Sequence, residues 1–266
     1  MAGDGWKVVM NQDGVTISSD LFQLTTNSTT QLENVVTELQ SVTQGAYGQY
    51  CGLSRASEMI GERWSLLILR DLLVSPKSME ELRAGLPRIS ASVLAMRLRE
   101  MEFSGVVHRQ DAMRGLDQAV YELTEYGRAV EDVLLALSRW GAMALAAPRP
   151  EDILTEDSMV MALRSTFRVE AALDLAVGFE LHVGEVVVHA VVDHGDLMVN
   201  AGPLPNADLI IESGTVLKGL ISGAVTVADA IASGEVKVTG DSKLLDTFVD
   251  LFHLPSAPAP LLSVNG

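Results

Sequence analysis

The chain has 266 residues, of which 48% are hydrophobic and 20% are charged, a composition typical of a globular protein with one large or two ordinary domains. No apolar run approaches the roughly 20 residues that a membrane span needs, and no basic segment followed by an apolar one marks a secretory signal at the N-terminus. A single cysteine excludes an internal disulfide. We therefore expect a cytoplasmic protein without membrane association.

The net charge of −16 by itself argues against nucleic acid as a partner. The distribution of the charges along the chain changes this conclusion. Residues 48–147 carry 12 Lys and Arg against 13 Asp and Glu, whereas residues 1–47 carry 1 against 5 and residues 148–266 carry 6 against 17. The basic residues of the middle segment are mostly Arg, which binds phosphate and guanine through paired hydrogen bonds. This asymmetry makes DNA the leading partner, with weak non-specific binding because the acidic flanks repel DNA.

Residues 1–47 form an appendage to which no role can be assigned. Strand-like runs on either side of Asn11–Gly14 predict a hairpin, because Asn and Gly supply the positive φ of a tight turn. A helix should follow, since Thr30 and Glu33 have the spacing of a capping box before an apolar helical stripe. We expect the appendage to pack on its own chain or on a partner subunit, and the alternative is a second ligand or protein site.

Residues 48–147 show the order of elements of a winged helix-turn-helix domain. Helical segments come first, then two short strands around a loop, then a long helix that begins at Thr124. The apolar side chains of the helix Ser90–Phe103 recur on one face, namely Ala91, Leu94, Leu98 and Met101, and predict its buried side. The residues expected in the domain core are Trp64, Leu66, Leu67, Leu69 and Leu73, while Leu137 and Trp140 are expected in packing or dimer contacts.

This part of the chain resembles a known family of regulators. The residues that carry the resemblance are Cys51 ahead of the first helix, Ile60–Leu72 with Trp64 and Arg70, Ile89–Met101, and Tyr121–Gly127. In these motifs the segment is similar to the HxlR-type regulators, relatives of the MarR regulators. The resemblance implies a homodimer that binds operator DNA through a winged helix, with two recognition helices about one helical turn of DNA apart.

The recognition helix and the wing supply the candidate DNA contacts. A recognition helix presents its N-terminal half to base edges, where small hydroxyls allow close approach and Arg reads guanine. We expect Ser92 and Arg97 near bases. The other expected contacts, to phosphates or through the wing, are Lys77, Arg88, Ser90, Arg99, His108, Arg109 and Arg114. The alternative for each Arg is a solvated or ion-paired surface charge.

The sequence departs from the family at Lys77–Met79. Family members usually show a basic-aromatic step such as Arg-Arg-Phe here, and this chain has Lys-Ser-Met. The departure weakens the argument for a contact between Lys77 and the DNA backbone. Ser78 with Glu81 still has the spacing of a capping box for the helix that follows.

The C-terminal part begins after Leu145–Asp152, where two prolines end the preceding helix. Its pattern predicts a helix near Thr155–Arg164, four consecutive strands, two short helices, a fifth strand at Glu235–Thr239 and a last helix at Asp241–Phe252. Because the strands are consecutive, we expect an α+β fold with an antiparallel sheet. The tail Ser256–Gly266 is expected to be irregular.

From Ala207 onward this part resembles the sterol carrier protein type 2 fold, most specifically where a helix leads into Ser233–Asp241. The resemblance covers about 155–254 and implies an antiparallel sheet under helices, an α/β sandwich over an apolar tunnel for lipid-like molecules. It would act here as a sensor of an unknown apolar ligand. The candidate lining residues are Leu217, Leu220, Ile221, Leu244, Leu245, Phe248 and Phe252, and the alternative for this stripe is plain core.

Cys51 offers a second way of sensing a signal. It precedes a helix that starts near Ser54 and lies close to Arg55, and both a helix N-terminus and a cation favour the oxidisable thiolate. Its position matches the cysteine that several HxlR-like regulators use to sense quinones, aldehydes or oxidants. The alternative is a small buried hydrophobic residue.

Motifs for catalysis and metal binding are not found. The chain contains no G-x-S-x-G, G-x-G-x-x-G or Walker sequence, and we expect neither an enzyme nor a bound cofactor. His182, His189 and His194 are spaced by seven and five within strands, which favours surface or hydrogen-bonded histidines over a zinc site.

The sequence therefore predicts a homodimeric regulator, acting as a repressor, that binds palindromic operator DNA and responds to an apolar small molecule. One alternative keeps DNA binding and makes Cys51 the sensor. The other is a lipid-binding protein whose winged helix serves only for dimerisation.

Overall fold

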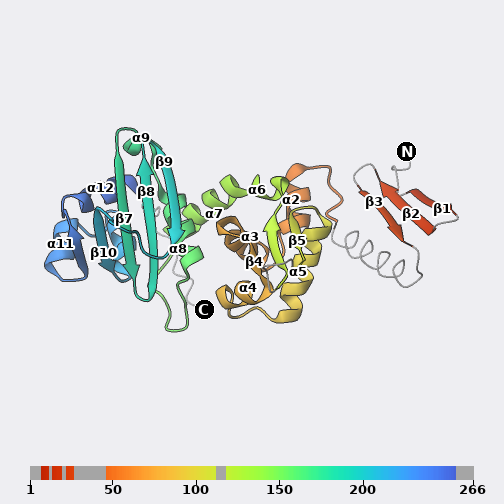
Figure 1. Cartoon of the computed structure of the whole chain (residues 1–266), viewed down its shortest axis with the longest axis horizontal. Helices are drawn as coiled ribbons and strands as arrows, with labels where there is room; N and C mark the ends of the chain where they lie inside the picture. The colour runs from red at the N-terminus through yellow and green to blue at the C-terminus, as the bar shows by residue number, and fades with distance from the viewer. Residues whose placement is uncertain (1–6, 12–13, 20–21, 27–45, 112–117, 256–266) are drawn as a thin grey trace. The chain divides into compact units, whose positions relative to one another are not determined.

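The computed structural model describes residues 7–11, 14–19, 22–26, 46–111 and 118–255. The chain divides into two compact units, Met1–Glu62 and Arg63–Gly266, which are described separately (Figure 1). The helix predicted after Thr30, the wing residue Arg114 and the tail after Pro255 lie outside the described residues. Among the described residues, none of the helices combines the length and the apolar character that crossing a membrane requires.

The first unit contains a three-stranded antiparallel sheet in the order β1-β2-β3 and one described helix. Strand β1 (Lys7–Asn11) pairs with β2 (Gly14–Ser19), with Asn11 opposite Gly14, as the hairpin pattern predicts. Strand β3 (Phe22–Thr26) extends this hairpin and was not predicted, although Phe22 and Leu24 alternate with polar residues. Helix α2 (Gly52–Ile60) begins after Cys51, two residues earlier than expected.

The second unit begins with the winged helix. Its elements alternate between helices that form the core and short strands that form the wing sheet, which has the order β4-β6-β5. They are α3 (Ser65–Val74), β4 (Lys77–Ser78), α4 (Met79–Gly85), α5 (Ala91–Phe103), β5 (Val107–Gln110), β6 (Val120–Leu123), α6 (Glu125–Arg128) and α7 (Glu131–Met143).

The prediction of one long helix from Thr124 is wrong in one respect, because the structure divides this segment into α6 and α7. The Thr124 hydroxyl accepts a hydrogen bond from Gly127 N at 2.9 Å and donates one to Gly105 O at 2.6 Å. A Cβ at Gly127 would lie 2.0 Å from Val106 O, so α6 is held directly against the backbone that enters β5. Helix α6 ends at its C-cap Ala129, and α7 starts after Val130.

Local capping explains where the helices of the motif begin. Ser78 accepts a hydrogen bond from Glu81 N at 3.2 Å, and the Glu81 carboxylate accepts one from Ser78 N at 2.7 Å, so the capping box expected from the sequence is present. Ser90 caps α5 by accepting from Val93 N at 3.3 Å. These two caps fix the N-terminal ends of α4 and α5.

The winged-helix core differs in part from the prediction. Leu69, Leu73, Leu94, Leu98 and Met101 are buried as expected. Four other residues predicted to be buried are not: Leu66 and Leu67 are 37% and 40% exposed, Ala91 is exposed in the first turn of α5, and Trp64 is half-buried at the N-cap of α3. Helix α3 is apolar on nearly every side, so hydrophobicity alone does not show which of its leucines face inward.

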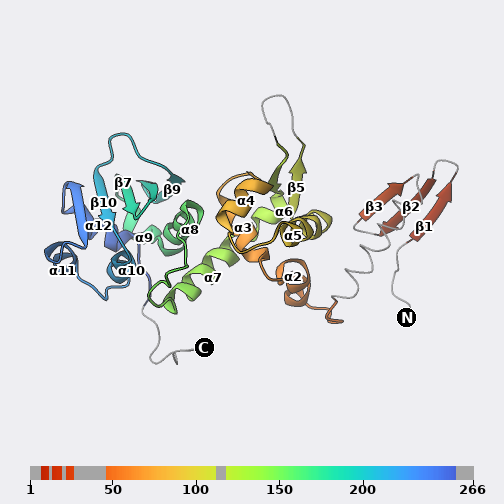
Figure 2. The same cartoon turned by 90° about the horizontal axis from the view of Figure 1, so that it is seen from below.

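The C-terminal part of the second unit contains a five-stranded sheet with helices on one face (Figure 2). Its elements are α8 (Glu156–Thr166), α9 (Val169–Ala172), β7 (Ala176–Val183), β8 (Val186–Asp193), β9 (Asp196–Ala201), β10 (Leu209–Ser213), α10 (Val216–Ile221), α11 (Val227–Ala232), β11 (Val236–Gly240) and α12 (Leu244–Leu251). The predicted element types are all present with small shifts at their ends, and the short helix α9 was not predicted.

The prediction of a wholly antiparallel sheet is wrong. The strand order is β11-β10-β7-β8-β9, and β10 runs parallel to β7 while the other neighbours are antiparallel. The segment 202–208 carries the chain back from β9 to the far side of β7. Asp208 N donates to Gly178 O at 2.9 Å, and the Asp208 carboxylate accepts from Gly178 N at 2.7 Å. Strands that follow one another in sequence are therefore not all neighbours in space.

The core of this part lies between the sheet and the helices. Phe248 stacks edge-on against Phe179 with ring centroids 5.3 Å apart, and Phe252 lies 4.7 Å from Phe248. All three rings are fully buried. The same cluster holds the residues predicted to line a ligand tunnel, namely Leu217, Leu220, Ile221, Leu244, Leu245, Phe248 and Phe252.

Candidate nucleic-acid interface

The N-terminal turn of α5 presents two hydroxyl groups to solvent. Ser90 and Ser92 are exposed, and their hydroxyl oxygens lie 3.1 Å apart. The opposite face of the helix is anchored in the core by Leu94, Leu98 and Met101. The helix is therefore held with its polar N-terminal end outward, which is the end that a recognition helix offers to base edges.

The two arginines of α5 are placed differently. The Arg99 side chain is exposed, and its Nε donates to Ala95 O at 3.2 Å. The Arg97 side chain is only 13% exposed, and its Nη1 lies 2.5 Å from the Glu100 carboxylate. A base contact by Arg97, as predicted, therefore requires this ion pair to open. Arg99 needs no such change.

The described part of the wing carries two of the predicted groups. His108 and Arg109 are exposed on β5, and Arg109 Nη2 lies 3.2 Å from the Asp111 carboxylate. Across the hairpin, Gln110 donates to Glu122 at 2.5 Å. The described base of the wing thus presents one paired cation and one imidazole.

Lys77 and Arg88, the other predicted backbone contacts, pair with carboxylates that follow α7. Lys77 Nζ lies 3.0 Å from the Asp157 carboxylate and 3.2 Å from Ser75 Oγ, and its side chain is 14% exposed. Arg88 Nη2 lies 3.7 Å from the Glu151 carboxylate in an exposed pair. The structure therefore leaves Ser90, Ser92, Arg99 and His108 open to solvent while Lys77 is largely enclosed.

Sequence reasoning missed a buried carboxylate beneath this surface. Asp71 of α3 is 0% exposed, and its Oδ1 accepts hydrogen bonds from Arg70 at 2.7 Å. Among the described residues, its Oδ2 has no hydrogen-bond partner. Burial raises the pKa of Asp71 to about 6, although the Arg70 guanidinium acts in the opposite direction. The available signal was the Arg-Asp pair inside an otherwise apolar helix.

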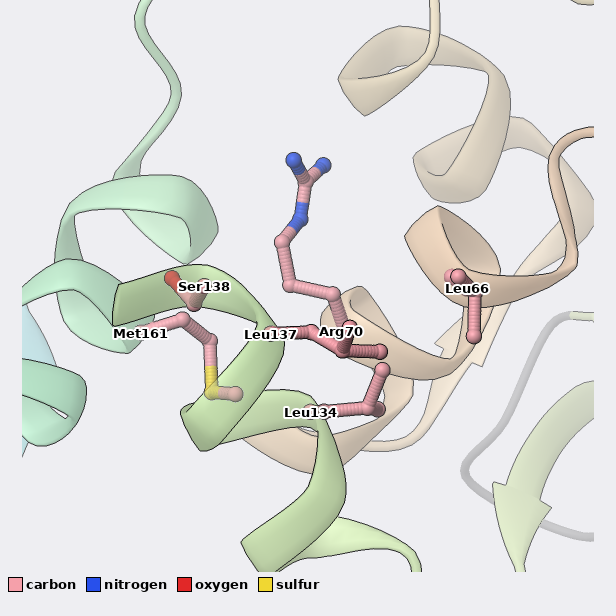
Figure 3. A pocket seen from close by; sticks show the side chains of 6 residues that line it. All are labelled: Leu66, Arg70, Leu134, Leu137, Ser138 and Met161. Carbon is pink, nitrogen blue, oxygen red and sulfur yellow. The ribbon is translucent and has the colours of Figure 1, made fainter. Parts of the chain in front are cut away.

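A shallow apolar pocket of about 180 Å³ lies where α3, α7 and α8 meet (Figure 3). Its lining residues are Leu66, Arg70, Leu134, Leu137, Ser138 and Met161. Figure 3 shows the Arg70 guanidinium pointing away from Leu134, so the aliphatic stem of Arg70 faces the pocket. This pocket is separate from the aromatic cluster in which the ligand was expected.

Cys51 is exposed at the N-cap of α2. The backbone N–H groups of Ser54 and Leu53 at the helix N-terminus lower the pKa of its thiol. Arg55, the cation expected to assist, instead pairs with Glu58 at 3.2 Å. The helix end, rather than the neighbouring arginine, therefore favours the thiolate.

The three histidines of the C-terminal sheet have separate hydrogen-bond partners. His182 lies 2.6 Å from the Glu180 carboxylate, His189 lies 2.9 Å from Gly202 O, and His194 contacts Asp193. Glu180 also accepts from Leu204 N at 2.6 Å, which ties the 202–208 segment to β7. In the part of the chain that the structure describes, no group of three or more His, Cys, Asp or Glu is arranged to hold a metal ion.

Comparisons with known proteins match the winged-helix part of the chain. Residues 59–148 match the family model of the HxlR-like helix-turn-helix proteins. The uncharacterized HTH-type transcriptional regulator YdeP of Bacillus subtilis (strain 168) is 34% identical over 91 residues, which are 34% of this chain and 71% of that protein. The HTH-type transcriptional regulator YodB of the same organism is 34% identical over 88 residues, 33% of this chain and 79% of that protein.

Among solved structures, a redox regulator, HypR, in its reduced form is similar at 30% identity with a TM-score of 0.33, over 34% of this chain and 90% of that chain. The sequence matches, together with the winged helix, define a helix-turn-helix transcription regulator. The chain belongs to the HxlR-like helix-turn-helix family. This assignment rests on the winged helix, because the matches cover about a third of the chain.

The buried Asp71 makes stability depend on pH in a defined window. Its pKa is about 6 in the folded chain against an ordinary value of 3.8, so between these values the folded state holds a proton that the unfolded state has released. Its contribution to stability therefore falls as pH rises through this window, by at most about 3 kcal/mol, and is constant above it. Asp71→Asn removes this dependence.

Urea unfolding of both proteins between about pH 4 and 7 measures the effect. The free energy of unfolding of the variant, relative to the unsubstituted protein, should rise with pH and level off above about 6. Asp132→Asn, at an exposed position of α7, controls for the loss of one carboxylate. A difference that is the same at every pH would show that Asp71 does not take up a proton in this range.

Proposed function

We propose that the chain is a cytoplasmic, homodimeric repressor that binds palindromic double-stranded operator DNA and is modulated by an apolar small molecule acting on residues 148–266. The observation that carries the DNA-binding part is the placement of α5. Its apolar stripe is buried, Ser90 and Ser92 face solvent at its N-terminal end, and Arg99 is exposed further along the helix. This arrangement suits insertion of the N-terminal half into the major groove, with Arg99 toward a phosphate.

Dimerisation is supported by an apolar surface on α7. Leu137 and Trp140 are 42% and 71% exposed and lie three residues apart on the helix. A twofold pair of winged helices would place two copies of α5 about one turn of DNA apart. In this proposal the chain has three parts, which are an appendage (residues 1–47), the DNA-binding domain (48–147) and the sensor domain (148–266).

The sensor role of residues 148–266 is supported by a sheet covered by helices, the layout that a sterol-carrier-like domain would have. The seven candidate lining residues contact one another within the core, so an apolar ligand would enter by separating α10 and α12 from the sheet. Such a ligand alters DNA binding only if it binds one arrangement of the chain better than the other.

Recovery of DNA from a genomic pool tests the proposal directly. Purified full-length protein is mixed with sheared genomic DNA, and the retained fragments are sequenced. Enrichment of fragments that share an inverted repeat supports an operator-binding dimer. No retention above that of a protein without a DNA-binding domain, at moderate salt, favours the alternative of a lipid-binding protein whose winged helix serves only for dimerisation.

Arg99→Ala should weaken binding to all DNA sequences by a similar factor, because a phosphate contact carries no sequence information. The slope of log affinity against log salt concentration should fall in magnitude by about 0.9, the value for one phosphate contact. Fluorescence anisotropy across a salt series measures both quantities. Lys237→Ala removes an equal charge at an exposed position of β11 and serves as the control. Equal slopes for the two variants would exclude the phosphate contact.

An apolar ligand should stabilise the full-length protein, because a molecule that binds only the folded state raises the melting temperature with its concentration. A thermal-shift panel of fatty acids, sterols and polyketide-like compounds tests this. An effective compound should also change affinity for the recovered DNA. The sensor proposal fails if the whole panel leaves both the melting temperature and the DNA affinity unchanged.

A second candidate is redox or electrophile sensing through Cys51. The observation that favours it is an exposed thiol at a helix N-terminus with a lowered pKa. Oxidation to a disulfide between two subunits removes one electron and one proton from each thiol, which diamide accepts, whereas a quinone adds to one thiolate.

Diamide or a quinone should therefore produce a linked dimer or an adduct and change DNA affinity at the same time. Non-reducing electrophoresis, intact mass and anisotropy measure these effects. Cys51→Ser should abolish the covalent change and the affinity change together. A protein that is modified at Cys51 without any change in DNA binding would show that the thiol has no regulatory role.

A further inference from the structure

Two of the cationic side chains predicted to contact DNA phosphates form ion pairs with carboxylates of this chain. Lys77 lies 3.0 Å from Asp157, and Arg88 lies 3.7 Å from Glu151. Both carboxylates belong to the short segment 151–157, which leads from the winged helix into α8. We call Glu151 and Asp157 the acidic pair. Carboxylates and phosphates bind the same ammonium and guanidinium groups, so the acidic pair and DNA would use the same partners.

The Lys77–Asp157 contact is the firmer of the two. The two side chains are only 14% and 16% exposed, and an ion pair shielded from water is screened less by salt than one on the surface. The Lys77 amine is also held by Ser75 Oγ at 3.2 Å. The Arg88–Glu151 pair is 63% and 50% exposed and adds a weaker contact.

The position of Asp157 is set by local structure. It lies in the first turn of α8, where Thr155 and Ser158 form a reciprocal cap: Ser158 N donates to Thr155 Oγ1 at 3.2 Å, and Thr155 N donates to Ser158 Oγ at 3.0 Å. Asp157 is therefore presented by an ordered turn and not by a loose loop.

The body of α8 is attached to both halves of the second unit. Arg164 Nη1 lies 3.4 Å from Leu73 O and 3.5 Å from the Glu131 carboxylate, and Arg139 Nε donates to Ser165 O at 2.6 Å. On the other side, Val160 and Leu163 of the same helix are buried in the C-terminal core. A shift of α8 relative to α3 would therefore move Asp157 away from Lys77.

We propose that the acidic pair competes with DNA phosphates for Lys77 and Arg88, so that docking of α8 on the winged helix lowers DNA affinity and its release raises it. This inference rests on the proposed DNA-binding function. It names the ion pairs through which residues 148–266 would influence the DNA-binding surface. By linkage, DNA that recruits Lys77 weakens α8 docking by the same factor.

The test uses the full chain and a labelled duplex of mixed sequence and about 30 base pairs, because phosphate contacts do not depend on sequence. Asp157→Asn removes the charge and keeps the size of the side chain. Glu156→Gln removes one charge from the adjacent, exposed position of the same helical turn and is the matched control. Both variants lose one negative charge near the helix N-terminus, so the general gain from reduced repulsion is shared.

Asp157→Asn should bind the duplex about two- to tenfold more tightly than Glu156→Gln at low salt, with a salt slope steeper by about 0.9. Lys77→Ala provides the second arm of the test. Since the competition acts through Lys77, the excess effect of Asp157→Asn over Glu156→Gln should disappear in the Lys77→Ala background.

The outcomes separate this inference from the proposed function. Equal affinities and slopes for Asp157→Asn and Glu156→Gln, in a protein that binds DNA, overturn the inference and leave the function intact. Persistence of the excess effect without Lys77 also overturns it. If neither the unsubstituted protein nor any variant binds the duplex at low salt or retains DNA from the genomic pool, the DNA-binding function fails and the inference fails with it. Binding gained only by Asp157→Asn supports both.

Discussion

The packing of α8 against α3 and α7 is the constraint on which the second unit depends. One side of α8 places Val160 and Leu163 in the C-terminal core, while Met161 faces α3 and α7 and lines the pocket between them. Val74 at the end of α3 also packs against the C-terminal core. The two halves of this unit therefore share an apolar boundary, reinforced by hydrogen bonds from Arg164 and Arg139.

Charge pairing shapes the surface of the winged helix that we propose binds DNA. Arg97, Arg109, Lys77 and Arg88 each have a carboxylate within 4 Å, and the partners of the last two come from residues beyond α7. The acidic excess of the chain is therefore not spread uniformly, because part of it sits directly on cations of the winged helix. A protein with a net charge of −16 can present a DNA-binding surface if its carboxylates can be displaced or moved aside.

Local signals predicted more than non-local ones did. The capping box of Ser78 and Glu81 and the buried Leu94 and Leu98 of α5 were predicted, because capping and a 3.6-residue period are encoded within one turn or two. The parallel placement of β10 was not readable, because it depends on Asp208 meeting Gly178 across 30 residues. The enclosure of Lys77 depends likewise on a partner 80 positions away. Nothing in the sequence around either residue indicates such a partner.

The double attachment of α8 has a consequence for how such a chain can change during evolution. The side chains at positions 160 and 163 pack in the core beneath the sheet, whereas those at positions 157, 161 and 164 contact the winged helix. Helical geometry interleaves these two sets within three turns. The winged helix is therefore not an exchangeable module, since a domain grafted in its place would need a matching cation, apolar surface and carbonyl acceptor before α8 could dock.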